Sequence, residues 1–134
     1  MGPREIICEG KILARFIPNT AWKEGLSFFS QDEEFVQVGA WVYDEGKALA
    51  PHVHNFVERK VTHTQEVLYI RSGSIQADIY DLKDQLCESL IVGAGEILIL
   101  LEGGHGYKIL ENATQVLEIK NGPYAGPEID RRRI

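Results

Sequence analysis

The sequence has few cysteines and no long apolar run, which argues against a disulfide-rich protein and against a membrane-spanning helix. Its 134 residues include two cysteines, Cys8 and Cys87, which lie far apart and have no CxxC spacing. Two such cysteines do not make a disulfide framework, so we expect thiols in a reducing compartment. The longest apolar run, Ile97 to Leu101, is much shorter than the ~20 residues that span a bilayer. Because the charged start of the chain also lacks the apolar core of a secretory signal, we predict a cytoplasmic protein.

Basic residues are outnumbered, which argues against two kinds of partner. The chain has 14 Lys and Arg against 20 Asp and Glu, a formal net charge of -6. Nucleic acids and anionic membranes require a basic surface that replaces their counterions. We therefore expect neither of them as a partner, and expect a small-molecule ligand or substrate instead.

Short runs with alternating polar and apolar residues occupy most of the chain, and no long helical pattern interrupts them. An N-terminal hairpin is predicted at about residues 4–17, because two β-rich runs flank the turn Glu9-Gly10. Further strands are predicted at 35–43, 66–70, 74–80, 86–92, 97–101, 105–110 and 114–120. About ten short strands separated by turn residues predict an all-β sandwich or barrel in a single domain, residues 1–134. The Pro- and Gly-containing end, about 121–134, is predicted to be a loop tail.

Histidine is also scarce, yet two of the four histidines form a pair. His52 and His54 are two residues apart in a segment predicted to be extended. Residues i and i+2 of a strand project to the same face, so the two imidazoles point the same way. Such a pair is a two-ligand clip for a metal ion.

The spacing around these histidines resembles the first motif of the cupin superfamily. That motif is a Gly, five residues, HxH, a spacer, Glu, six residues and Gly. This chain has Gly46, five residues, His52-Val53-His54, then Glu66, six residues and Gly73. The spacer between His54 and Glu66 is eleven residues, where the family has three or four.

A second stretch resembles the other cupin motif, which is a Gly, five residues, PxG and then a His. Here Gly95 is followed after five residues by Leu101-Glu102-Gly103 and then by Gly104-His105. Leu101 replaces the proline, and His105 arrives one residue early. The runs 64–69 and 119–124 are similar to those of small single-domain bacterial cupins of the mannose-6-phosphate isomerase-like type.

The resemblance implies a double-stranded β-helix, the cupin or jelly-roll barrel, with one divalent transition metal ion. Its ligands would be His52, His54, Glu66 and His105. Glu66 shares a face with the apolar Leu68 and Ile70, and a cation removes the cost of burying its carboxylate. His63 is the competing fourth ligand, although it faces the other way on a straight strand. Three imidazoles and one carboxylate suit Zn, Fe, Mn, Ni or Co.

The same resemblance implies a metal-dependent enzyme that acts on a small polar or anionic metabolite, such as a sugar or sugar-phosphate. The alternatives are a non-catalytic cupin that binds or senses a small ligand, an iron-dependent dioxygenase, and a metal-free epimerase. Tyr107 shares a face with His105, and Arg59 lies in the long spacer, so both are candidate substrate-binding residues. Exposed sheet edges at the N-terminal hairpin predict a homodimer.

Overall fold

Ten short strands make up almost all of the regular structure in the computed structural model, which describes residues 2–134. The strands are β1 (Arg4–Cys8), β2 (Lys11–Ile17), β3 (Gly25–Phe28), β4 (Gly39–Val42), β5 (Glu66–Ser72), β6 (Ser74–Tyr80), β7 (Leu86–Gly93), β8 (Ile97–Leu100), β9 (Gly104–Ile109) and β10 (Gln115–Lys120). One 3-10 turn (Asn19–Ala21) and one short helix, α1 (Pro127–Asp130), complete the elements. Across the described residues, no helix is long and apolar enough to cross a membrane.

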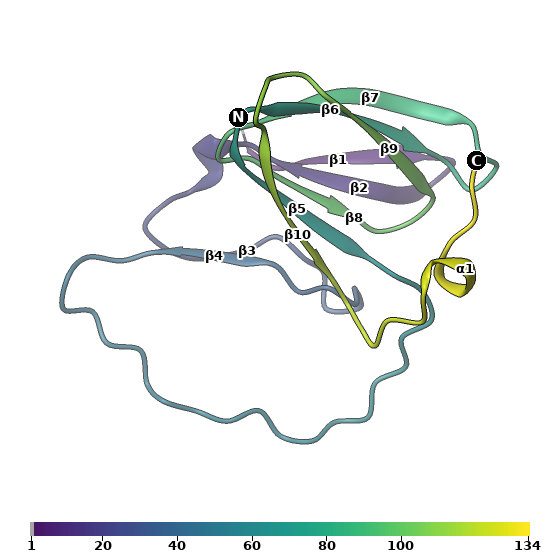
Figure 1. The fold of residues 1–134 in the computed structure, drawn as a ribbon. Coiled ribbons are helices and arrows are strands. Elements are labelled where there is room, and N and C mark those ends of the chain that lie inside the picture. The colour runs from purple at the N-terminus through teal and green to yellow at the C-terminus, as the bar shows by residue number, and fades with distance from the viewer. Residues whose placement is uncertain (1) are drawn as a thin grey trace.

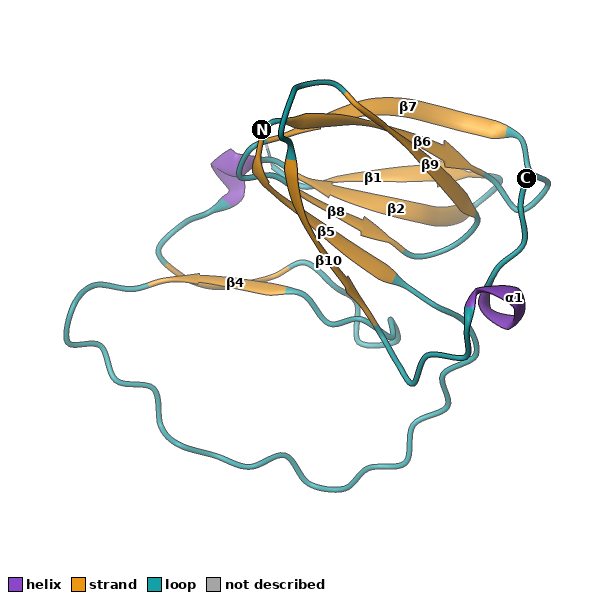
Figure 2. Cartoon of the chain, viewed as in Figure 1, coloured by secondary structure: helices purple, strands orange, loops and turns teal. Residues whose placement is uncertain are grey.

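The strands form three antiparallel sheets arranged in layers (Figure 1). A five-stranded sheet has the order β1-β2-β8-β5-β10, and a three-stranded sheet has the order β7-β6-β9. Figure 2 shows that these two sheets lie face to face, with the β3-β4 ribbon beyond the five-stranded sheet. The all-β prediction is therefore confirmed, whereas a closed barrel is not formed within residues 2–134.

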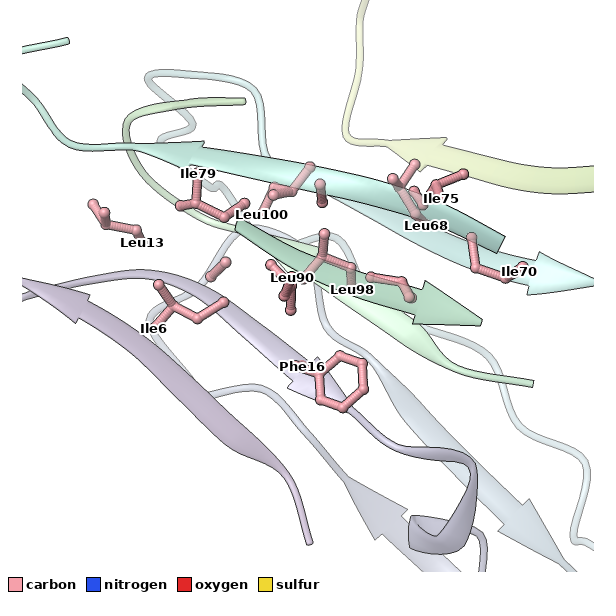
Figure 3. Packing of buried hydrophobic residues seen from close by; sticks show 13 residues of the cluster. Ile6, Leu13, Phe16, Leu68, Ile70, Ile75, Ile79, Leu90, Leu98 and Leu100 are labelled. Carbon is pink, nitrogen blue, oxygen red and sulfur yellow. The ribbon is translucent and has the colours of Figure 1, made fainter. Parts of the chain in front are cut away.

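The main hydrophobic core lies between the two larger sheets. On β6, Ile75, Ala77 and Ile79 are buried while their neighbours are half exposed, as a period of two requires. These side chains meet apolar residues from the facing sheet, among them Leu68 and Leu98 (Figure 3). Alternation on each strand thus fixes which face of each sheet turns inward.

A second apolar cluster covers the outer face of the five-stranded sheet. Val67, Ile97 and Ile99 point to that face and pack with Phe29 and Ala40 from the region of the β3-β4 ribbon. β8 is therefore buried on both faces, which explains its unbroken apolar sequence.

Most predicted strands have nearly the observed bounds, and the N-terminal hairpin forms as expected. The exception is the predicted strand 35–43, of which only Gly39–Val42 is a strand. The tail predicted as a loop contains the one-turn helix α1.

The connection between β4 and β5 is a long exposed arch. We call residues 43–62 the extended segment, and every one of them is exposed. In Figure 1 it swings away from the layered sheets before returning to β5. Its return is anchored at Gln65, whose backbone N–H donates to the Asn121 Oδ1 at 2.7 Å.

Candidate functional site

A cavity of about 990 Å³ opens at one end of the layered sheets. Strands β5, β9 and β10 supply part of its wall, and the C-terminal tail from Pro127 to Ile134 supplies another part. Glu66, His105 and Tyr107 line it together with Glu118 and Lys120. This volume is in the range of pockets that hold small molecules.

Strand register brings Glu66 and His105 together. Glu66 pairs with Lys120 of β10, and His105 pairs with Ile79 of β6. Because Ile79 points into the core, His105 beside it also points inward. The His105 Nε2 and the Glu66 Oε2 are 2.6 Å apart, and the Glu66 side chain is only 7% exposed. The pair predicted from the two cupin-like motifs is thus in direct contact.

The Glu66 carboxylate is held in its charged form by its neighbours. Burial alone would raise its pKa, but hydrogen bonds with His105 and Glu118 and the charges of His105 and Lys120 lower the pKa to about 2. The Lys120 Nζ lies 3.4 Å from the Glu66 Oε1. The same two effects shift the pKa of Lys120 in the opposite directions. Burial lowers it, and the charges of Glu66 and Glu118 raise it above the ordinary value.

Two more side chains feel the Glu66 charge. The hydrogen bond with Glu66, burial and the negative charge of Glu66 raise the pKa of Glu118. Burial and the charges of Glu66 and Glu118 raise the pKa of Tyr107, so its phenol stays protonated. The Tyr107 ring stacks on the His105 ring, with centroids 5.3 Å apart, which confirms that these residues share a face.

Glycines shape the turn that delivers His105. Gly103 has a φ of +74°, and a Cβ there would lie 2.1 Å from the backbone oxygen of Tyr80. A side chain is therefore excluded on both conformational and steric grounds. At Gly104 a Cβ would meet the side chain of Ile134, so the tail packs directly against the turn.

The C-terminal tail brings cations to the cavity. Arg132 donates two hydrogen bonds of 2.9 Å to Asp84, and the Thr64 hydroxyl donates to Asp130. These contacts hold the tail across the cavity, where Arg131 and Arg133 also form part of the wall.

The structure places the other predicted site residues elsewhere. His52 and His54 lie in the extended segment, with their ring centroids 5.1 Å apart, so they are neighbours as strand parity predicts. Arg59 is exposed in the same segment. His63 lies at the cavity rim, where its Nε2 is 3.2 Å from the Leu101 carbonyl oxygen. Among residues 2–134, no three His, Cys, Asp or Glu side chains converge to hold a metal ion.

Sequence reasoning missed two groups of the site, Glu118 and Lys120. Both sit on the predicted strand 114–120 with Val116, at alternate positions. Strand parity would have placed them on one face, and two charges at alternate positions of a short β-rich run were a usable signal. The tail arginines could not be placed from sequence, because a loop has no such period.

The fold defines this chain as an all-β protein built from antiparallel sheets. Comparison with known proteins finds no matching family model, no matching curated protein and no matching solved structure.

Proposed function

We propose that the chain is a cupin-type protein whose cavity binds a small polar, anionic metabolite, such as a sugar-phosphate, and acts on it as an enzyme. The observation that carries this proposal is the 2.6 Å contact between Glu66 and His105 in the wall of a cavity of about 990 Å³. Titratable groups with shifted pKa values in a cavity are typical of functional sites.

The cavity wall has four cationic side chains among seven carboxylates, and the cations offer a place for one anionic group of a ligand. Arg131 and Arg133 line the cavity, and the side chain of Lys120 is 29% exposed. Guanidinium groups bind carboxylates and phosphates through paired hydrogen bonds. A phosphate held by these groups would place the rest of the metabolite near Glu66 and His105.

A divalent transition metal ion, Zn, Fe, Mn, Ni or Co, belongs to this proposal as the cofactor. Within the described part of one chain its four expected ligands are not gathered, because His52 and His54 lie in the extended segment. Glu66 and His105 are half of the ligand set. Once bound, such an ion would act as a Lewis acid on a substrate oxygen. Anion binding by Lys120, Arg131 and Arg133 does not depend on the metal ion.

A second candidate, an isomerase or epimerase that needs no metal, is favoured by the stacking of Tyr107 on His105. The imidazole accepts or returns a proton, Glu66 orients the ring, and the phenol donates a hydrogen bond to substrate. In this case His105 is a catalytic base rather than a ligand.

Ligand binding and metal content test the proposal. We expect thermal shift and calorimetry with a panel of sugar-phosphates to find a ligand. Glu66→Gln should weaken its binding at least tenfold, because Glu66 positions the Lys120 ammonium and the His105 imidazole in the cavity wall. Glu111→Gln is the matched control, because Glu111 accepts a hydrogen bond from Ser74 outside the cavity. Binding that survives Glu66→Gln would contradict the proposed site.

Turnover and elemental analysis then separate the candidates. Turnover with about one transition metal per chain supports the metal-dependent enzyme, and turnover after chelation supports the metal-free isomerase. Oxygen consumption by the iron-loaded protein would indicate a dioxygenase. Tight binding without turnover across the panel would indicate a sensor or binding protein.

A further inference from the structure

The extended segment exposes several large apolar side chains. Val53 is 86% exposed, and Phe56 is fully exposed, with Leu49, Val57 and Val61 exposed as well. Apolar exposure on this scale in one segment indicates an interaction surface. Its three acidic residues (Asp44, Glu45 and Glu58) balance three basic ones (Lys47, Arg59 and Lys60), so it lacks the positive charge of a membrane-binding segment.

Two strand edges beside the cavity are open. β10 pairs with β5 alone, and β9 pairs with β6 alone, among the strands that residues 2–134 form. Every residue of β10 is exposed, including Leu117 at 55% and Ile119 at 48%. Open edges present unpaired N–H and C=O groups that accept another strand.

The extended segment is long enough to pair with both edges. Its 20 residues can span roughly 65 Å at about 3.3 Å per residue. β9 and β10 have six residues each, about 20 Å of edge per strand. A segment that runs along one edge, turns and runs along the other therefore fits with residues to spare.

We propose that the extended segment of a second copy of this chain pairs with β9 and β10, and that the exchange is reciprocal. The partner's His52 and His54 then enter the cavity beside Glu66 and His105. The inference deepens the proposed function and rests on it for the metal, because the four ligands are gathered across two chains. Its interface also differs from the one at the N-terminal hairpin that the sequence predicts.

The occupant is a second copy because one chain carries both halves of the interaction. The edges of β9 and β10 have no neighbouring strand, and the exposed segment pairs with no strand of its own chain within residues 2–134. In a two-fold dimer each chain supplies what the other lacks, and both needs are met by a single symmetric interface. The segment's own chain holds it in an arch away from the sheets (Figure 1).

Size and cross-linking test the exchange without any metal. We expect the purified full-length protein to be a dimer by light scattering. A mixture of ¹⁵N-labelled and unlabelled chains, unfolded and refolded together, should give lysine cross-links from Lys60 of one isotope to Lys108 or Lys120 of the other. A monomer, or cross-links confined to one isotope, would overturn the proposal.

Point variants test the same interface. Phe56→Ser removes an apolar side chain that is fully exposed in one chain, so folding should be unaffected and the dimer should dissociate at least tenfold more readily. Ile91→Ser is the matched control, since Ile91 is 64% exposed on β7, and it should leave the dimer intact. Equal behaviour of the two variants would contradict the interface.

Complementation between defective chains tests the shared site. One chain carries His52→Ala and His54→Ala, and the other carries Glu66→Gln and His105→Ala. Each alone should lose metal, while the purified heterodimer should hold half the wild-type metal per chain, because one of its two sites is complete. A heterodimer without metal, when the wild type binds it, shows that each chain closes over its own cavity and overturns the exchange. If the wild-type dimer gives cross-links between chains but binds no metal, the exchange stands and the metal cofactor does not.

Discussion

Two charged side chains are almost equally buried in this molecule, yet their surroundings differ. The side chains of Arg15 and Glu66 are each 7% exposed. The Arg15 guanidinium donates to the carboxylates of Glu5 and Glu34 and to the carbonyl oxygen of Phe29. Glu66 shares its site with the His105 imidazole, the Lys120 ammonium and a second carboxylate, that of Glu118, at the wall of a cavity.

The difference separates a charge that is fully paired with protein oxygens from a charge that lies beside a second carboxylate at a cavity. Every nitrogen of the Arg15 guanidinium donates to a protein oxygen, so the cluster fastens β1 and the region around Phe29 to β2. Around Glu66, the hydrogen bond with Glu66, burial and the charge of Glu66 raise the pKa of Glu118. Sites that break local rules of charge pairing are often functional.

The largest effect on stability is expected at the sealed cluster of Arg15, Glu5 and Glu34. Arg15→Met would leave the nearly buried Glu34 carboxylate without its cation, at a cost of about 3–5 kcal/mol. Urea denaturation followed by circular dichroism measures the change. A loss below about 1 kcal/mol would show that the cluster contributes little to the fold.

A smaller effect on stability is expected at the open cluster around Glu66. Glu66→Gln keeps the shape and can still hydrogen-bond with His105, and it removes the repulsion from Glu118. The loss of the ionic contacts is thereby offset, and we expect a change of about 1 kcal/mol or less in the same assay. Ligand affinity should nevertheless fall at least tenfold. A change as large as that of Arg15→Met would place Glu66 among the residues that stabilise the fold.

The inward-facing side chains of the strands could be predicted from sequence, because strand periodicity is a local pattern. Alternation in 74–80 predicts which side chains enter the core, and the structure buries Ile75, Ala77 and Ile79. Parity likewise predicts that Tyr107 lies beside His105. Closure of the barrel could not be predicted in this way, because pairing between distant edges depends on contacts that no local pattern records.

The candidate site was predictable only in part, for the same reason. Motif spacing brings Glu66 and His105 together correctly, because both lie on strands whose register is fixed by a buried face. His52 and His54 are neighbours as predicted, but their segment has no fixed register against any strand of its own chain within residues 2–134. Alternation along a strand predicts which way a side chain points, but its position in the fold depends on which strand its own strand pairs with.

The Asp81 carboxylate at the cavity wall should stabilise the fold, as the Arg15 cluster does. The Asp81 Oδ1 accepts backbone hydrogen bonds of 2.9 Å from Gln85 and Lys83. The bond from Gln85 lowers the pKa, burial raises it, and the bond from Lys83 lowers it further, so the net shift is downward. A lowered pKa in the folded state stabilises the protein above the unfolded value of about 3.9, and this stabilisation is lost as pH falls.

We therefore expect Asp81→Asn to lower the thermal midpoint at pH 7, and the difference from wild type to shrink below about pH 4. Differential scanning calorimetry at several pH values measures both. A difference that stays constant from pH 7 to pH 3 would mean that the charge of Asp81 is not what stabilises the turn.

The smallest effect is expected at an ion pair that resembles the Arg15 cluster in geometry but not in burial. Arg4 makes two hydrogen bonds to Glu88, at 2.5 and 3.0 Å, and its side chain is 42% exposed. Water competes for both partners, so Arg4→Gln should cost less than about 1 kcal/mol. Added salt should reduce that cost further, while the cost of Arg15→Met should change little because its partners are shielded from ions. If the two variants cost the same at high and low salt, burial would not be what distinguishes these clusters, and the distinction between Arg15 and Glu66 would have to rest on the cavity alone.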